Sequence, residues 1–262
     1  MSRFLSEVTN SCLNFIFGVG EVCFFFWNSI VATVTPPYDY GLLTAQIYDI
    51  GFRSISIVVV SAMAIGMVMV VQMAWGFAWF GAKGLVGPMV TLAFVRELGP
   101  IITSLLVGGR VGSGITAEIS SMKVTEQIDA IKTLGADPIR KLVSPRLMAC
   151  IISFPLLAVI SNLAGIGGAM IISQMELNVK PTLFIESIRG WVSLEDLMTG
   201  ISKTLFFGII VAITGCYVGM KAEGGTRGVG NATTKTVVIS LFLIILFDFI
   251  LSKIFVIAIY DF

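Results

Sequence analysis

The sequence predicts an all-α integral membrane protein with five transmembrane helices. Of its 262 residues, 56% are hydrophobic and 13% are charged, and the mean hydropathy is +0.95. A soluble domain of this length does not need so much apolar sequence. Apolar runs reach about 20 residues, the length of a helix that crosses a bilayer. No linker or repeat divides the chain, so we expect one domain over residues 1–262, with an N-terminal region, 1–50, and a membrane core, 51–262.

The N-terminal stretch 4–34 predicts an amphipathic helix that lies at the membrane surface. Its apolar run, VCFFFWNSIVATV, is short, and Asn10, Asn14 and Glu21 interrupt the residues before it. Such a mixture suits a helix in the interfacial plane better than one in the hydrocarbon. A sixth transmembrane helix is the alternative.

Four of the five spans follow from long apolar runs, which cover residues 54–75, 147–172, 197–220 and 237–260. The second span in chain order starts near Gly84 and ends between Gly109 and Glu118. It contains Arg96 and Glu97 side by side. Its glycines and its proline permit either a kinked helix or a re-entrant segment followed by a helix.

The distribution of basic residues predicts the orientation. Connections rich in lysine and arginine stay in the cytoplasm. Two connections are rich in them, one between the second and third spans and one between the fourth and fifth: Lys123, Lys132, Arg140, Lys141 and Arg146, then Lys221, Arg227 and Lys235. With five spans, the N-terminus is then cytoplasmic and the C-terminus lies on the opposite side. Trp75, Trp79 and Phe80 fit an aromatic belt at the outer edge.

The connection between the second and third spans, residues 122–146, predicts a short helix parallel to the membrane. Thr125 is the expected N-cap, and Gly135 with Pro138 ends the helix. Its apolar residues follow helical spacing: Val124, Ile128, Ile131 and Leu134. Its polar residues then face the cytosol, where a soluble partner can grip them: Glu126, Gln127 and Asp129. A surface helix that only joins two spans is the alternative.

One continuous run, RELGPIITSLLVGGRVGSGITAEISSMKVTEQIDAIKTLGADPIRKLVSPRLMACIISFPLL at residues 96–157, resembles the signature region of the MlaE (YrbE) family of ABC-transporter permeases. The later KAEGGTRGVGNATTKTVV and the final apolar span resemble the same family's last loop and helix. The resemblance covers nearly the whole chain after about residue 50. The N-terminal stretch departs most from the family pattern.

The resemblance implies a homodimeric permease of the bacterial inner membrane, with its C-terminus in the periplasm. Its partners would be a cytoplasmic MlaF-like ATPase, a small STAS-type MlaB-like subunit and a periplasmic MlaD-like ring of MCE domains. The complex would move phospholipid between the inner membrane and the path to the outer membrane, and so maintain outer-membrane lipid asymmetry. Residues 123–138 would be the coupling helix, with these residues at the ATPase: Glu126, Gln127, Ile128, Asp129, Ile131 and Asp137.

The sequence is consistent with an ATPase in a separate subunit. No GxxxxGK[ST] phosphate loop occurs, and GGTRGVGN lacks the lysine and hydroxyl that hold nucleotide and Mg²⁺. We therefore expect no cofactor in this chain, with ATP and Mg²⁺ bound by the partner. The formal net charge of +1, without a basic tail, gives no reason to expect a nucleic-acid partner.

Arg96 and Glu97 are the candidate substrate site. A charge at the bilayer centre costs about 2.5 to 3.5 kcal/mol on insertion scales, so it is usually paired or faces a wet cavity. Adjacent helical residues point about 100° apart, so each needs another partner. Lys203 is the candidate for Glu97, which leaves Arg96 free to meet a lipid phosphate. By the family resemblance these positions belong to the lipid cavity; the alternative is that they only join helices.

Three further residues carry weaker expectations. Met73, in a methionine-rich first span, and Phe80 are expected to contact the acyl chains of the substrate, although methionine is also ordinary apolar filler. Asp248, in the middle of the last span, is expected to be a hydrogen-bonded packing residue rather than a proton carrier.

Two other functions compete with the permease. In an ion- or proton-coupled secondary transporter of a lipid or amphiphile, the buried charges would form a relay and no ATPase would be needed. An intramembrane enzyme needs a nucleophile with a base, or a metal set. The chain has no histidine to serve Ser113, and its four cysteines are scattered singly in apolar stretches, so we expect neither an enzyme nor a metal site.

Overall fold

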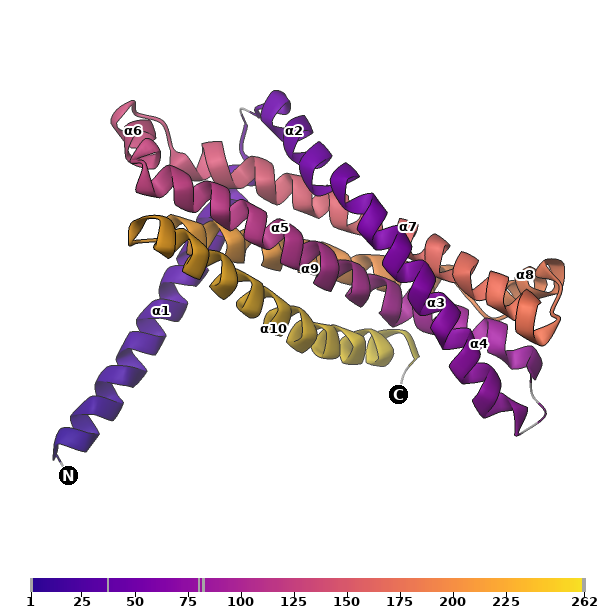
Figure 1. Cartoon of the computed structure of the whole chain (residues 1–262). Helices are drawn as coiled ribbons and strands as arrows, with labels where there is room; N and C mark the ends of the chain where they lie inside the picture. The colour runs from indigo at the N-terminus through magenta and orange to yellow at the C-terminus, as the bar shows by residue number, and fades with distance from the viewer. Residues whose placement is uncertain (1, 37, 80, 82, 261–262) are drawn as a thin grey trace.

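The computed structural model describes residues 2–36, 38–79, 81 and 83–260, and these ranges contain helices and no strands (Figure 1). The helices are α1 (Ser2–Val34), α2 (Tyr40–Ile50), α3 (Ile55–Ala78), α4 (Val86–Ala93), α5 (Gly99–Val124), α6 (Gln127–Thr133), α7 (Ser144–Leu177), α8 (Pro181–Arg189), α9 (Leu194–Met220) and α10 (Gly225–Tyr260). Two short 3₁₀ helices cover Phe52–Ser54 and Lys83–Leu85. Two π-helical turns cover Phe94–Leu98, the outer π turn, and Ile139–Val143, the inner π turn.

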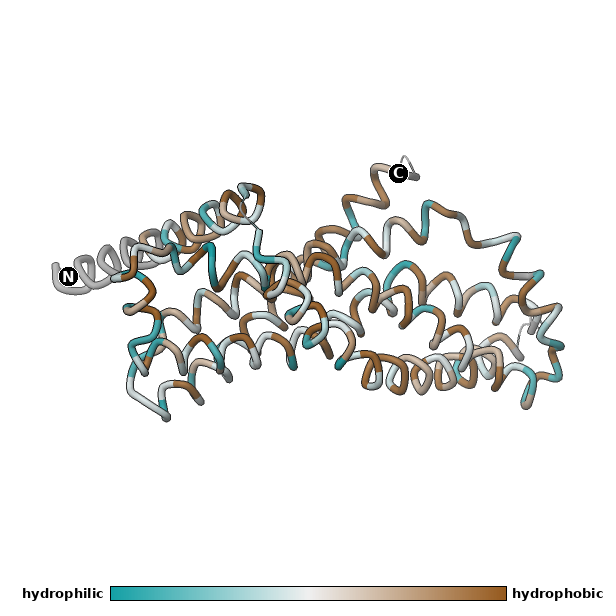
Figure 2. Tube along the Cα trace, turned by 90° about the horizontal axis from the view of Figure 1, so that it is seen from above, coloured by the Kyte–Doolittle hydropathy of each residue, from teal (hydrophilic) through white to brown (hydrophobic). Residues whose placement is uncertain are grey.

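The long helices form an elongated bundle. Figure 1 shows α6 at one end, which we call the inner end, and α8 at the other, which we call the outer end. Helix α5 packs against α7, α9 and α10, and α3 packs along α7. Figure 2 shows hydrophobic residues along the middle of the long helices and hydrophilic residues in the connections at both ends. This is the pattern of a bundle whose middle lies in hydrocarbon.

The described residues contain six helical stretches that are long and apolar enough to cross a membrane. They are Phe17–Val34, Tyr40–Phe77, Val86–Val124, Ile139–Leu177, Leu194–Met220 and Gly225–Ala258. The last five overlap the five predicted spans almost completely, so these spans are confirmed as helices. The first is the segment for which a surface helix was predicted, so the number of helices that cross the membrane, and their orientation, stay predictions.

Helix α1 differs from the other long helices in its direction. Figure 1 shows that it runs obliquely to the bundle and leaves it towards its own N-terminus. Within Phe17–Val34, only Ser29 and Ala32 are buried. The direction and the limited contact set α1 apart from the bundle, and its predicted interfacial position stays a prediction.

The charged second span is one helical path. Residues Val86–Val124 run through α4, the outer π turn and α5 without a break in the helix. The re-entrant segment allowed by the sequence is therefore not present, and the irregularity takes the form of a π turn at residues 94–98. Arg96 and Glu97 both lie within this turn.

Candidate functional site: a charge cluster at a π-helical turn, and helix α6

The outer π turn follows from the position of Pro100. In an α-helix the Arg96 carbonyl accepts from the N–H of residue 100, but proline has no N–H. The N–H of Gly99 donates to the carbonyl of Phe94 instead of that of Val95, which inserts one extra residue into the turn. Such π turns are rare and occur often at functional sites.

Three glycines let other parts of the bundle approach this turn. Gly200 of α9 lies so close to the carbonyl of Val95 that a methyl group there would overlap it. Gly165 of α7 lies against the ring of the buried Phe94 in the same way, and Gly99 lies against the Asn162 side chain. The turn is therefore clamped between α7 and α9.

Two ion pairs tie the turn to α9. The Nζ of Lys203 lies 2.6 Å from Oε2 of Glu97, so the predicted pairing of these residues is confirmed. Arg96 donates from Nε to Oδ1 of Asp196 at 2.6 Å. Arg96 and Glu97 thus have separate partners, as predicted. The expectation that Arg96 is left free is wrong, because a carboxylate from the start of α9 already binds it.

Asp196 is held in place by the N-terminus of α9. The side chain of Ser193 accepts from the N–H of Asp196, and the Asp196 carboxylate accepts from the N–H of Ser193 at 2.9 Å, which is a capping box. Asp196 is buried. A buried carboxylate fixed by backbone donors holds the Arg96 guanidinium in one orientation.

Lys203 is the centre of the cluster, and its side chain is 0% exposed. Its ammonium also donates to Oγ of Ser252 at 2.7 Å and to the Arg96 carbonyl at 3.4 Å, and it lies 3.6 Å from Oδ1 of Asp248. Asp248 and Ser252 occupy adjacent turns of α10. Asp248, expected to be a packing residue, is therefore an ion-pair partner of Lys203. We call Arg96, Glu97, Asp196, Lys203 and Asp248 the charge cluster.

The charge cluster lies in the outer half of the bundle. At 1.5 Å per residue, Lys203 is about 14 Å from the start of α9 and about 26 Å from its end. The Glu97 side chain is 43% exposed, whereas the side chain of its partner Lys203 is fully buried. The cluster therefore presents one accessible carboxylate above a buried cation.

The second predicted site, helix α6, is shorter than expected and starts differently. Thr125 is not its N-cap: Thr125 ends α5, and its hydroxyl donates to the Ser121 carbonyl at 2.9 Å. Glu126 occupies the N-cap position with φ 61°, a left-handed conformation that turns the chain sharply between the two helices. Gly135, with φ 77°, ends the helix as predicted.

Helix α6 turns one side towards the bundle and the other towards solvent. Ile128 is 3% exposed, and Ile131 is partly buried against the same core. These two residues therefore anchor α6 to the bundle, and their side chains are not a binding surface for a partner. Glu126 and Gln127 are exposed, as expected. Leu134, expected on the apolar side of this helix with Ile128 and Ile131, is instead 85% exposed. It is an apolar side chain available to a partner at the inner end.

The other two polar residues of this segment are held by short-range contacts. Asp129 accepts from Lys123 at 2.9 Å and from Lys132 at 3.5 Å, and these bonds, that to Lys123 foremost, lower its pKa. Asp137 accepts from the N–H of Ile139 at 2.9 Å and so begins the inner π turn.

The sequence profile of the permease MlaE family matches residues 43–254. The chain belongs to the MlaE permease family. A Rickettsia typhi protein named a probable ABC transporter permease is 37% identical over 241 residues, which are 92% of this chain and 93% of the relative. A Synechocystis protein of the same description is 41% identical over 181 residues, 69% of each chain. One from Porphyra purpurea is 39% identical over 196 residues, 75% and 74% of the two chains.

The match to the MlaE permease family runs from α2 into α10, so it includes both the charge cluster and α6. The predicted membership is confirmed. Met73, a predicted substrate contact of this MlaE-family chain, is partly buried. It packs against the hydrophobic cluster of buried residues that contains Phe94. Phe80, the other apolar contact, lies outside the described residues. The substrate roles of both stay predictions.

Sequence reasoning missed Asp196 and Ser252, and it missed that Asp248 belongs with Lys203. Signals for all three were present. Ser193 and Asp196 have the spacing of a capping box at the start of a span, which draws the carboxylate towards the helix end. Asp248 and Ser252 are four residues apart, so they share one face of a helix.

Proposed function

We propose that this MlaE-family permease moves phospholipid between the inner membrane and the periplasmic path to the outer membrane, powered by ATP hydrolysis in a separate subunit. The observation that carries the proposal is the charge cluster: paired charged side chains in the outer half of the bundle, with the Glu97 side chain 43% exposed and that of Lys203 fully buried. Intramembrane charges of this kind mark substrate pathways. A phospholipid is a substrate that has both ionic and apolar parts.

In this proposal the headgroup binds at the outer π turn. Glu97 receives the cationic part of a headgroup, and Arg96, oriented by Asp196, receives the phosphate. The Arg96 side chain is 32% exposed, so it reaches the surface while it remains paired. The acyl chains lie along the apolar side chains near this turn, with Met73 and Phe80 among them.

Helix α6 is the proposed coupling helix. It joins directly to the 26-residue α5, which is about 39 Å long and leads from α6 to the outer π turn. A partner ATPase that binds the exposed Glu126, Gln127 and Leu134 therefore pushes on α5, and α5 leads to the outer π turn that carries Glu97. The nucleotide and Mg²⁺ belong to that ATPase.

The proposed assembly is a homodimer. The inner half of α5 exposes a stripe of small and polar residues that does not suit contact with lipid: Arg110, Gly114, Glu118 and Ser121. Polar residues in a span face protein or water rather than lipid, so a second copy is the proposed cover. The periplasmic MCE-domain ring and the STAS-type subunit are proposed from the family resemblance.

A reconstituted complex tests the function. Glu97→Gln removes the exposed charge and should reduce phospholipid transfer by about tenfold, the loss of one charge-assisted hydrogen bond. Glu195→Gln, at an exposed glutamate near the same end, is the matched control. ATPase attachment should be unchanged in both. Normal transfer by the Glu97 variant would refute the substrate role, and transfer without any ATPase would favour the gradient-driven alternative.

A further inference from the structure

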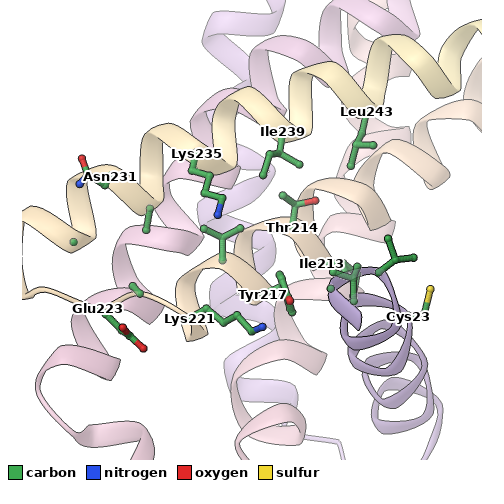
Figure 3. Close-up of a pocket in the computed structure, with 17 residues that line it drawn as sticks. Cys23, Ile213, Thr214, Tyr217, Lys221, Glu223, Asn231, Lys235, Ile239 and Leu243 are labelled. Atoms are coloured by element: carbon green, nitrogen blue, oxygen red, sulfur yellow. The ribbon is translucent and has the colours of Figure 1, made fainter. Parts of the chain in front are cut away.

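A groove of about 880 Å³ lies between α1, α9 and α10 in the inner half of the bundle (Figure 3). Its walls are mainly apolar and include Val22, Ile213, Val218, Ile239 and Leu243. The groove is separate from the charge cluster, because Lys203 precedes Ile213 by about 15 Å along α9. Its volume is within the range of about 300 to 1,000 Å³ that is usual for ligand pockets.

Two lysines and one glutamate, Glu223, lie at the mouth of the groove. Lys221, which follows α9, and Lys235 of α10 both line it. Figure 3 shows Lys235 directed from α10 towards α9, and Lys221 lying along Tyr217. Lys221 is already engaged: it forms an ion pair with Glu21 of α1, which raises its pKa, and its ammonium lies 4.9 Å from the centre of the Tyr217 ring.

Lys235 has no such partner. Among the side chains that the structure describes, which exclude those of residues 1–16, no carboxylate lies within ion-pair distance of its ammonium. The side chain is exposed at the groove. A lysine beside an apolar groove, without a counter-ion from its own chain, is ready to bind an anionic group.

The depth of the groove fits a lipid. From Lys235 to Leu243 along α10 the wall is about 12 Å long, and the apolar part lies towards the middle of the bundle. Lys221 follows α9 and Lys235 lies in the first part of α10. Both precede the apolar run 237–260, in the segment that the distribution of basic residues places in the cytoplasm. The cations therefore lie where phosphate headgroups lie, and the apolar wall lies where acyl chains lie.

We propose that this groove binds a glycerophospholipid of the cytoplasmic leaflet, with its phosphate on Lys235 and an acyl chain along Ile213, Val218, Ile239 and Leu243. The site goes beyond the proposed function, since it lies on the opposite side of the membrane from the charge cluster and does not depend on transport. An apolar helix of another protein would leave Lys235 covered and unpaired.

Photo-crosslinking of the full chain tests the site. The protein is placed in nanodiscs of phosphatidylethanolamine and phosphatidylglycerol with a trace of phosphatidylethanolamine that carries a diazirine on one acyl chain. Adducts are mapped by mass spectrometry. We expect them in residues 213–218 and 239–243. Lys235→Glu should reduce them by about tenfold, as expected for the loss of a charge-assisted hydrogen bond, whereas Lys253→Glu, at an exposed lysine of the same helix, should not.

Three results would overturn the proposal. An unchanged adduct yield in Lys235→Glu would show that the lysine does not bind the phosphate. Equal labelling by a diazirine diacylglycerol, which has no phosphate, would show that only the apolar wall matters. A groove that stays unlabelled while the exposed Val60 of α3 is labelled would show that another protein chain covers it. None of these results depends on transport activity.

Discussion

Replacing Lys203 by methionine removes the one cation that α9 places between the carboxylates of Glu97 in the outer π turn and Asp248 in α10. Methionine has a similar length and is apolar, so the change leaves little empty space. What it removes is the ammonium, which lies 2.6 Å from Glu97 and 3.6 Å from Asp248. Both carboxylates then lose their counter-ion.

The magnitude follows from the burial of the three groups. Removing one partner of a buried ion pair costs about 3 to 5 kcal/mol, because the remaining charge stays buried without compensation. The Asp248 side chain is 14% exposed, so most of the energetic cost comes from its unpaired charge. The Glu97 side chain is 43% exposed, so water still solvates its charge. We therefore expect a loss of about 3 kcal/mol in the free energy of unfolding, near the lower end of that range. Lys203→Met combined with Asp248→Asn should recover about 1 to 2 kcal/mol of it, as expected for groups in contact.

The assay is equilibrium unfolding of the purified chain in mild detergent, followed by the fluorescence of its four tryptophans. Lys253→Met is the matched control, since this lysine is exposed on α10, and it should change stability by less than about 0.5 kcal/mol. If Lys203→Met is as stable as Lys253→Met, the cluster does not hold the three helices together. If the double variant is less stable than the single one, Asp248 is not paired with Lys203.

Three other predictions concern the outer π turn and α6. Gly200→Ala should cost about 1 to 3 kcal/mol in the same unfolding assay, since its methyl group meets the carbonyl of the turn, while Gly230→Ala, with open space around it, should cost nothing. Ile128→Ala should release α6 at a cost of about 2 to 5 kcal/mol and raise hydrogen exchange there; unchanged exchange would contradict the anchoring role. Asp129 has a lowered pKa through Lys123, so its contribution is present above the pKa of a free aspartate, about 4, and is lost as the pH falls through the lowered value. Exchange of α6 amides, corrected for intrinsic rates, should rise in that acidic range and not above it.

The pairing of Glu97 with Lys203 could be predicted because the membrane restricts the choice. A carboxylate at bilayer depth needs a partner at similar depth, and apolar spans contain few charges. The fourth span has only one basic residue between 197 and 220, which is Lys203. The sequence therefore offered a very short set of candidates, and the structure contains the expected pair at 2.6 Å.

The partner of Arg96 could not be found in the same way. Asp196 comes directly before the predicted fourth span, 197–220, so its sequence position gave no reason to expect it beside Arg96. The capping box with Ser193 buries its carboxylate at the start of α9, and that burial depends on how α9 packs against the outer π turn. The local sequence predicts the capping box of Ser193 and Asp196. The pairing of Asp196 with Arg96 depends on a tertiary contact, which the local sequence does not predict.

The start of α6 shows a conflict between two local signals. Thr125 is a good N-cap residue, but it follows the last turn of a long helix, where a threonine hydroxyl also bonds to the carbonyl four residues before it. The second arrangement is the one observed, to Ser121, and it moves the turn to Glu126 in a left-handed conformation. A conformation that is costly for glutamate cannot be expected from its propensity.

Pro100 and Lys203 act as one structural unit although they are far apart in the sequence. Because proline has no N–H, the Arg96 carbonyl loses its α-helical donor, and the Lys203 ammonium lies 3.4 Å from that oxygen. The same ammonium binds Glu97, which the π turn rotates towards α9 and α10. The backbone irregularity and the charge cluster therefore stabilise each other. An α-helical turn at residues 94–98 would change the direction of Glu97, and the loss of Lys203 would leave both the carboxylate and the carbonyl without this donor.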